Sequence, residues 1–315
     1  MKRKILALLL LLALLLTACS CDSNEPNNPS TVDGAGQTAV IDKDREGNSI
    51  TLPQAVDKII AMGPSNAEIL VALDCGDKII AADTYASNVE GLKADIPLFS
   101  MSEPDGEQII NLAPDVIFVT GMSKAGGDDP YKLVSDAGIC VIYIPSSSSI
   151  QGIKDDISYI AEVVGQKEKG VEIIEKMEKE ISDIKAIGDT ITDKKSVYFE
   201  ISAAPYMYSF GKNTFLNEMI ELIGAENVLS DQESWIPVAD EAVLNANPDV
   251  ILTSVNYIEN PVDEIKSRPG WDSIAAVQNG EVYYIDTDSS NQPSQNIIKA
   301  LLEMAKGIYP DKYEG

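Results

Sequence analysis

One phrase of the sequence occurs twice, and this repetition constrains the fold more than any other feature. Glu107 begins the segment EQIINLAPDVI, and Glu241 begins the segment EAVLNANPDVI. In each copy a short helical stretch follows the glutamate, a proline seven residues later ends the helix, and an apolar strand comes next. Because the spacing is the same in both places, the sequence predicts an internal duplication, with two halves of one design.

Short apolar runs alternate with helical patterns in both halves. This alternation predicts an α/β fold, in which each half is a Rossmann-like lobe with a mostly parallel sheet. A hairpin is expected over residues 38–52. The predicted strands lie at 58–62, 78–81, 116–119, 140–144, 196–201, 250–253 and 282–285, and helices in the second half lie at 214–223, 241–245 and 295–307.

Two amphipathic stretches follow the strands of the first half: 150–164, which ends that half, and 167–187, which lies between the halves. In the second stretch apolar residues recur every three or four positions, and lysines and glutamates fill the other faces. A helix over 167–187 would measure roughly 30 Å at about 1.5 Å per residue. The sequence therefore predicts a stiff helical connection between the lobes and not a flexible linker.

The N-terminus is typical of an exported protein. Three basic residues precede an apolar run over 5–16, which is shorter than the roughly 20 residues that a membrane span requires. Leu-Thr-Ala before Cys19 resembles the lipobox of bacterial lipoproteins, in which the cysteine carries the lipid; the alternative is an ordinary signal peptide with an incidental cysteine. Residues 20–37 are rich in Asn, Pro, Ser, Asp and Gly, as in a flexible tether.

These patterns divide the chain and place it outside the cytoplasm, anchored to the cell membrane by the lipid on Cys19. The expected parts are a signal peptide at 1–18, a lipidated flexible tether at 19–37, an N-terminal lobe at 38–164, a connecting helix at 165–190 and a C-terminal lobe at 191–315.

Charge and composition exclude several classes of function. The net charge is −26, and it becomes more negative once the basic signal residues are removed, so nucleic-acid binding is excluded. The chain has no histidine, which rules out Ser-His-Asp and Cys-His catalysis and His-bearing zinc sites. It also disfavours an adhesin that binds bare metal ions. A cell-surface hydrolase that uses only carboxylates remains the alternative class. Cys75 and Cys140 are expected to be free thiols.

Several phrases resemble the solute-binding lipoproteins of ABC importers for ferric siderophores, haem and cobalamin. They are IIAMGPSNAEIL at 59–70, FGKNT at 210–214, IGAEN at 223–227 and RPGW at 268–271. The resemblance implies two Rossmann-like lobes joined by a single long helix. It further implies a monomer without catalytic activity, cofactor or bound metal, which delivers its ligand to the transmembrane subunits of the importer.

The resemblance also assigns roles to the duplicated glutamates. In this family one exposed glutamate on each lobe docks onto arginines of the importer, and the matching positions here are Glu107 and Glu241. The alternative is that each glutamate merely complements the positive N-terminus of its own helix. Ser65 and Glu68 are expected to form a capping box, which makes Glu68 structural.

In such relatives the ligand lies between the lobes, against loops that follow the strands. Trp271 belongs to a structural phrase and is expected in the core, whereas Trp235 stands in a polar stretch and is expected to be partly exposed. The ligand-binding candidates are Ser65, Asn66, Tyr85, Met101, Ser102, Met122, Lys124, Tyr206, Tyr208, Trp235 and Tyr257.

The few basic residues narrow the choice of ligand. Beyond the signal segment the only arginines are Arg45 and Arg268, and neither is expected in a cleft loop. A strongly anionic catecholate siderophore needs several cationic donors, and haem is usually held by a histidine. The sequence therefore favours a cobalamin-like corrinoid or a neutral hydroxamate siderophore, with a haem receptor as the alternative.

Overall fold

The computed structural model describes residues 41–124 and 127–313. The predicted signal peptide, the lipidated Cys19 and the tether lie outside these residues. No helix within the described ranges is both long and apolar enough to cross a membrane.

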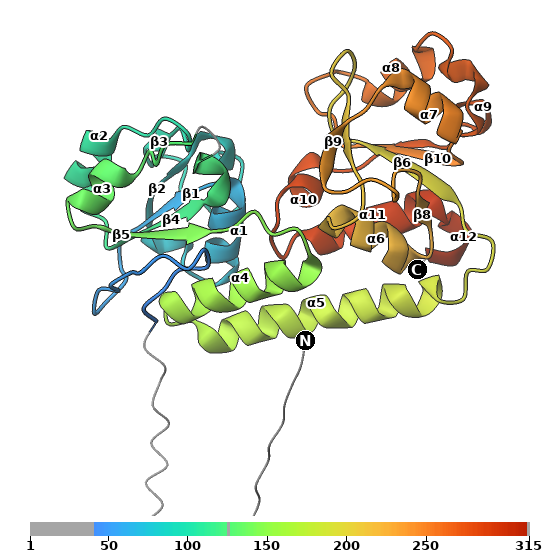
Figure 1. The fold of residues 1–315 in the computed structure, drawn as a ribbon. Helices are drawn as coiled ribbons and strands as arrows, with labels where there is room; N and C mark the ends of the chain where they lie inside the picture. Colours follow the sequence, from blue (N-terminus) through green and yellow to red (C-terminus); the bar gives the residue numbers. More distant parts are fainter. Residues whose placement is uncertain (1–40, 125–126, 314–315) are drawn as a thin grey trace, which may run out of the picture. The chain divides into compact units, whose positions relative to one another are not determined.

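The first lobe is built on a parallel five-stranded sheet (Figure 1). The strand order is β3-β2-β1-β4-β5. Helices α1 and α4 contribute apolar side chains to the core on one face, and α2 and α3 to the core on the other. The strands are β1 (Ile59–Met62), β2 (Ile79–Asp83), β3 (Leu98–Phe99), β4 (Val116–Thr120) and β5 (Cys140–Ile144), and the helices are α1 (Pro64–Ala72), α2 (Gly106–Leu112), α3 (Lys132–Asp136) and α4 (Ile150–Val163).

The second lobe repeats this arrangement with one strand fewer. Its parallel sheet has the order β11-β10-β6-β8, and a separate antiparallel pair joins β7 to β9. The strands are β6 (Ser196–Glu200), β7 (Tyr208–Phe210), β8 (Glu226–Asn227), β9 (Trp235–Pro237), β10 (Val250–Thr253) and β11 (Val282–Tyr284), and the helices are α6 (Phe215–Ile223), α7 (Asp240–Ala246), α8 (Pro261–Ser267), α9 (Ala275–Asn279), α10 (Thr287–Asn291), α11 (Ile297–Ile308) and α12 (Pro310–Tyr313).

The two copies of the repeated phrase fold alike, which confirms the predicted duplication. Helices α2 and α7 each end at a residue in the left-handed conformation, Ala113 at φ 48° and Asn247 at φ 46°. The aspartate two residues later accepts hydrogen bonds from the backbone at the start of the neighbouring strand: Asp115 from Lys58 N and Asp249 from Ser196 N, both at 2.8 Å. The strands that follow, β4 and β10, each pair in parallel with the first strand of their own sheet.

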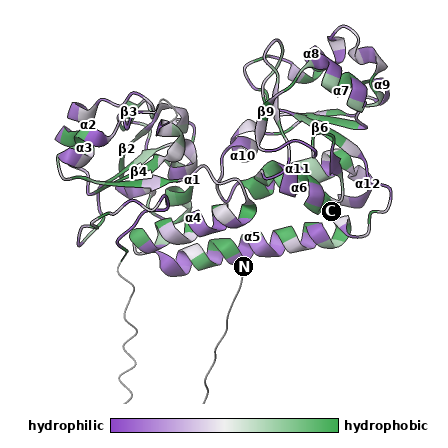
Figure 2. Ribbon diagram, in the orientation of Figure 1, coloured by the Kyte–Doolittle hydropathy of each residue, from purple (hydrophilic) through white to green (hydrophobic). Residues whose placement is uncertain are grey.

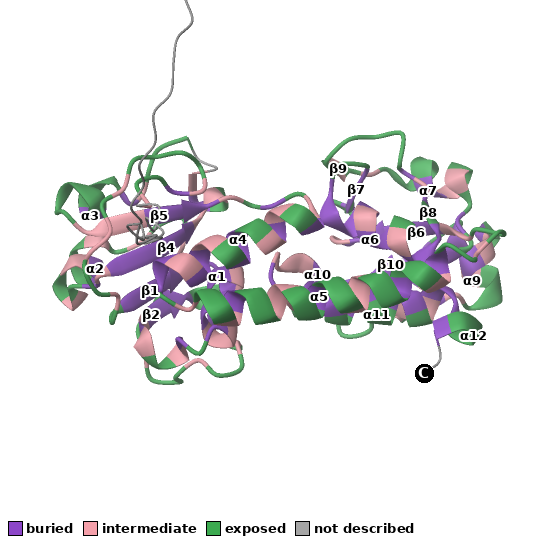
Figure 3. Ribbon diagram, turned by 90° about the horizontal axis from the view of Figure 1, so that it is seen from below, coloured by how far each residue is buried: buried purple, intermediate pink, exposed green. Residues whose placement is uncertain are grey.

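Helix α5 (Lys167–Gly188) joins the lobes as a single continuous helix. Figure 2 shows apolar and polar bands alternating along it, and Figure 3 shows the exposed outer turns of α4 and α5. Two glycines let its backbone approach its neighbours closely. A Cβ at Gly170 would lie 2.5 Å from Ala161 Cβ on α4, and one at Gly188 would lie 2.2 Å from Leu222 O on α6. The predicted stiff connection is therefore packed tightly against both lobes.

The core is not divided cleanly between the lobes. One cluster of buried apolar residues runs from the α1 and α4 face of the first sheet, along α5, to the α6 and α11 face of the second. Two smaller clusters cover the opposite faces of the two sheets. Each sheet therefore has one face covered by a core of its own lobe and one face covered by the core that both lobes share.

The described part of the expected hairpin is short. Lys43 and Ser49 form an antiparallel bridge, and on either side of it Asp44 N donates to Asn48 O and Ile50 N donates to Asp42 O, both at 2.9 Å. The buried carboxylate of Asp44 accepts hydrogen bonds from Asn48 N at 2.8 Å and Tyr143 N at 3.1 Å and so holds the turn against β5. The short strands β3, β7, β8 and β9 were not predicted.

Candidate functional site

The carboxyl ends of strands from both sheets face one cavity between the lobes, as is usual for ligand sites of open α/β sheets. Its volume is about 380 Å³. We call it the interlobe pocket. The first lobe lines it with Gly63, Pro64, Ser65, Tyr85, Met101, Thr120, Met122 and Ser146, and the second with Asn256, Thr287, Asp288, Asn291, Gln292 and Pro293.

Four predicted ligand residues line this pocket. They are Ser65 after β1, Tyr85 after β2, Met101 after β3 and Met122 after β4. Tyr85 is 75% exposed and Met122 is 62% exposed, although both side chains are largely apolar. Large apolar side chains left open beside a cavity are typical of a binding surface.

Four further candidates form an aromatic surface on the second lobe, outside the lining of the pocket. Tyr206 is 84% exposed, and Tyr257 accepts a hydrogen bond from Ala203 N at 2.8 Å. Tyr208 Oη donates to Trp235 O at 3.4 Å. The Trp235 ring packs edge-on against Phe210 and Phe215, with centroids 5.8 and 6.0 Å away, and remains 36% exposed. Trp271 is fully buried, which confirms its predicted place in the core.

Three other candidates lie outside the lining of the pocket. Asn66 is buried, and its Nδ2 donates to Met62 O at 3.0 Å. Ser102 lies beside Ser100 on the surface. The Lys124 ammonium sits 3.2 Å from the centroid of the Tyr143 ring and 3.4 Å from a carboxylate oxygen of Glu46. Because Lys124 makes these contacts outside the lining, neither lysine nor arginine from the described part of the chain lines the interlobe pocket.

None of the residues that the second lobe contributes to the pocket was among the predicted ligand residues. Thr287, Asp288 and Asn291 belong to α10, which directly follows β11. A usable signal was present, because a polar run after a predicted strand is the pattern by which Tyr85 and Met122 were found.

The expected capping box at the start of α1 was wrong. The helix begins at Pro64 with Gly63 as its N-cap residue, so Ser65 is already inside the first turn. The Glu68 carboxylate instead accepts a hydrogen bond from Ser294 Oγ, and Gln295 Nε2 donates to Glu68 O at 3.3 Å. Glu68 therefore links α1 of the first lobe to the segment before α11 of the second.

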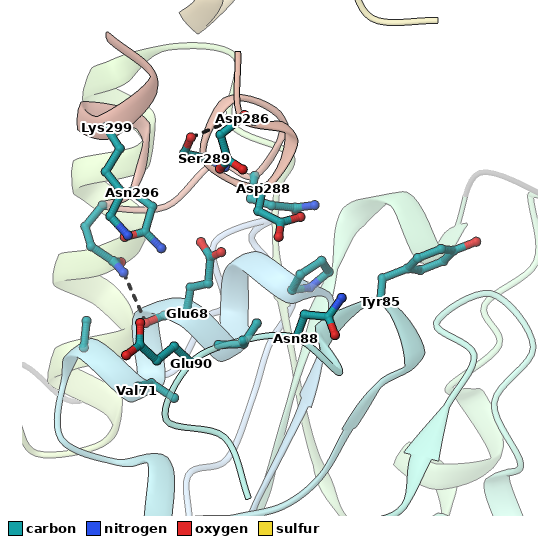
Figure 4. Close-up of a pocket in the computed structure, with 15 residues that line it drawn as sticks. Glu68, Val71, Tyr85, Asn88, Glu90, Asp286, Asp288, Ser289, Asn296 and Lys299 are labelled. Atoms are coloured by element: carbon teal, nitrogen blue, oxygen red, sulfur yellow. Dashed lines mark hydrogen bonds between the residues drawn. The ribbon is translucent and has the colours of Figure 1, made fainter. Parts of the chain in front are cut away.

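Glu68 lies in a second cavity beside the interlobe pocket, which we call the adjoining pocket (Figure 4). Its volume is about 340 Å³, and it shares Pro64, Tyr85, Asp288 and Gln292 with the interlobe pocket. Burial raises the pKa of Glu68 to about 7, although the hydrogen bonds from Ser294 and Asn296 oppose the rise. The contact between the lobes therefore contains a carboxyl group that titrates near neutral pH.

Replacing Glu68 with glutamine is expected to stabilise the protein at alkaline pH. The stability that the raised pKa contributes is fully present below pH 4.5 and is lost as the pH rises through about 7. Glutamine stays neutral, so Glu68→Gln should exceed wild type by up to roughly 3 kcal/mol at high pH and match it near pH 4.5. Urea denaturation at both pH values measures the difference. Glu90→Gln, an exposed neighbour, serves as the control, and an equal gain at both pH values would contradict the account.

The described residues contain no group of three or more His, Cys, Asp or Glu side chains placed to hold a metal ion. Cys75, which is buried, and Cys140, which is half-buried, are free thiols as predicted.

Comparison with known proteins assigns the family. Residues 59–289 match the family model described as periplasmic binding protein. The chain is 31% identical over 313 residues to YvrC of Bacillus subtilis, described as an uncharacterized ABC transporter substrate-binding lipoprotein; the match covers 98% of this chain and 97% of YvrC. It is 22% identical over 299 residues to a cobalamin-binding protein of Halobacterium salinarum, covering 90% and 78% of the two chains.

A solved structure agrees with this assignment. A possible iron-binding, periplasmic solute-binding protein of Staphylococcus epidermidis matches with a TM-score of 0.72 at 27% identity, over 81% of this chain and 100% of the other. The chain therefore belongs to the periplasmic binding protein family, as a solute-binding component of an ABC transporter and not an enzyme.

Proposed function

We propose that this protein captures a bulky metal chelate in the interlobe pocket, preferentially a corrinoid, and delivers it to the membrane subunits of an importer. The observation that carries the proposal is the chemistry of the lining. Among the described residues, hydroxyl, amide, thioether and aromatic groups and the single carboxylate of Asp288 surround the cavity, and neither lysine nor arginine is among them. A corrinoid has a large apolar ring edged with amides and little net charge, which suits such a lining.

The interlobe pocket alone would enclose only part of a bulky chelate. A ligand larger than the cavity of about 380 Å³ would extend from it. The exposed rings of Tyr206, Tyr257 and Trp235 on the second lobe could then pack against the protruding part. The similarity to a cobalamin-binding protein of Halobacterium salinarum points to the same ligand class.

A neutral ferric hydroxamate is the second candidate. The likeness to the possible iron-binding protein of Staphylococcus epidermidis favours it, and it would also suit a lining without cations. Haem is less well matched, because its two carboxylates would meet no basic side chain among the lining residues.

Titration of the purified protein with cyanocobalamin, haem and several ferric siderophores tests this proposal. Cyanocobalamin is expected to quench tryptophan fluorescence saturably, because Trp235 is partly exposed whereas Trp271 is buried. In Trp235→Phe the quenching should largely disappear while equilibrium dialysis still detects binding. Quenching by siderophores or haem alone would contradict the corrinoid preference, and conversion of any ligand to a product would contradict the receptor role.

Membrane anchoring through a lipid on Cys19 is part of the proposal. The lipobox-like sequence supports it, as does the description of YvrC as a lipoprotein. The anchor would hold the receptor outside the cell, beside the importer that it serves.

We further propose that Glu107 and Glu241 dock onto basic residues of the importer. Both are exposed, and neither has a hydrogen-bond or ion-pair partner among the described residues. The alternative is that each glutamate only complements the positive N-terminus of its own helix. This is weaker for α2, because Asp105 already caps that helix by accepting a hydrogen bond from Gln108 N at 2.9 Å. Two carboxylates at equivalent positions of the duplicated lobes would orient the receptor as well as attract it.

A further inference from the structure

Among the described residues that line the interlobe pocket, Asp288 is the one with a charged side chain. It also lines the adjoining pocket, where Glu68, Glu90 and Asp286 add three carboxyl groups and Lys299 adds one ammonium group. The opening between the lobes therefore carries an excess of negative charge. A multiply anionic ligand would be repelled from it, and a cationic one attracted.

Lys124 and the two arginines of the described residues do not reduce this excess. Lys124 is held by Glu46 and the Tyr143 ring. Arg268 is buried against Glu200, with their charged atoms 2.6 Å apart, and Arg45 is paired with Asp156 at 2.7 Å. All three cations are already neutralised by partners of their own.

The Asp288 side chain neither caps a helix nor pairs with another described side chain. Helix α10 is capped by Asp286, whose carboxylate accepts a hydrogen bond from Ser289 N at 2.9 Å. Within the described ranges the Asp288 side chain is exposed and makes neither a hydrogen bond nor an ion pair. Figure 4 shows it extending from α10 toward the loop that carries Tyr85 and Asn88. An unpaired carboxylate in this position is available to a ligand.

We infer that Asp288 sets the charge specificity of the pocket, by selecting chelates that present a cationic group, or a neutral hydrogen-bond donor, at the α10 side. This inference rests on the proposed function and specifies its ligand class further, as a metal chelate of neutral or positive net charge. The partners of Asp288 would be an ammonium group on a ferric hydroxamate, or the amide N–H groups and the positive charge of an aquacorrinoid.

Two pairs of ligands that differ by one charge provide the test. One pair is a linear ferric trihydroxamate with a free terminal amine and the same chelate with the amine acetylated. The other pair is aquacobalamin, a cation, and cyanocobalamin, which is neutral. Affinities are measured by calorimetry near neutral pH on wild type, Asp288→Asn and Glu90→Gln. Glu90 is the matched control, because it lines only the adjoining pocket.

Wild type is expected to bind the cationic member of whichever pair it accepts about tenfold more tightly than the neutral member. In Asp288→Asn this preference should fall to within about twofold, whereas Glu90→Gln should keep most of the preference. In wild type, raising the salt concentration from about 50 to 500 mM should weaken the preference. The same preference in wild type and Asp288→Asn would overturn the inference, as would an equal loss in Glu90→Gln or tightest binding of an anionic tricatecholate. Failure of all four ligands to bind would instead refute the proposed function itself.

Discussion

Replacing Arg268 with methionine is expected to lower the free energy of unfolding by about 3 to 5 kcal/mol. Arg268 is 8% exposed and donates to both carboxylate oxygens of Glu200, at 2.6 and 2.8 Å. Its Nε donates to Glu264 at 2.9 Å, and its guanidinium carbon lies 4.5 Å from the centre of the Trp271 ring. The Arg268 side chain therefore links α8 and the Trp271 ring to β6.

The size of the effect follows from the burial of Glu200. That residue is fully buried in β6, and burial raises its pKa even with Arg268 beside it. Without the guanidinium group, a carboxylate would remain in the core unpaired, or would have to take up a proton. Either costs far more free energy than the loss of a surface ion pair.

Urea denaturation of Arg268→Met measures the loss, and two variants interpret it. Lys212→Met, which breaks an exposed ion pair with Glu233 at 3.3 Å, should cost less than about 1 kcal/mol. The double variant Arg268→Met with Glu200→Leu should recover much of the stability, because no buried charge then lacks a partner. A loss for Arg268→Met as small as that for Lys212→Met would show that the buried pair contributes little.

Reversing both docking glutamates is expected to abolish uptake without affecting ligand binding. In Glu107→Lys with Glu241→Lys, each lobe would present an ammonium group to the basic residues proposed on the importer, so that attraction becomes repulsion. Ligand affinity should stay within about twofold of wild type, because neither glutamate lines the interlobe pocket. Uptake of labelled ligand into cells, together with affinity in vitro, measures the two effects separately.

A second double variant controls for the change in net charge. Glu168→Lys with Glu175→Lys reverses two exposed carboxylates on α5, for which the described part of the chain offers no ion-pair partner. This variant alters the total charge equally and should transport normally. Normal uptake by the Glu107 and Glu241 variant, or an equal defect in the α5 variant, would defeat the docking assignment.

The strands of the two main sheets were largely predictable, since buried parallel strands are continuous apolar runs. Ile59–Met62 and Val250–Thr253 are entirely buried and stand out in the sequence for that reason. The connecting helix was equally predictable, because apolar residues recur along it every three or four positions. Strand β3 was not, because it has two residues and Leu98 is 42% exposed, so its pairing with β2 leaves no pattern in the sequence.

The candidate site was predictable only in part. Met101 became a candidate because it lies just before the helix that carries Glu107, since β3 was not predicted. The rule that ligand residues follow strands found Tyr85 and Met122, since the backbone alone determines where those loops lie. It could not foresee that Lys124 would turn toward Glu46 and Tyr143, because that choice depends on contacts between distant segments. The same limit applies to Glu68, whose partner Ser294 lies on the other lobe and replaces the expected helix cap.

Hydrogen–deuterium exchange of the purified protein with and without cyanocobalamin tests the central claim most directly, namely that one ligand is held by strand-following loops of both lobes. We predict that bound ligand slows exchange in the loops at 63–65, 84–88 and 120–122 of the first lobe and at 254–257 and 286–293 of the second. Exchange in β1 and β10 should change little. Protection confined to one lobe, or protection in neither set of loops by a ligand that binds, would contradict the account.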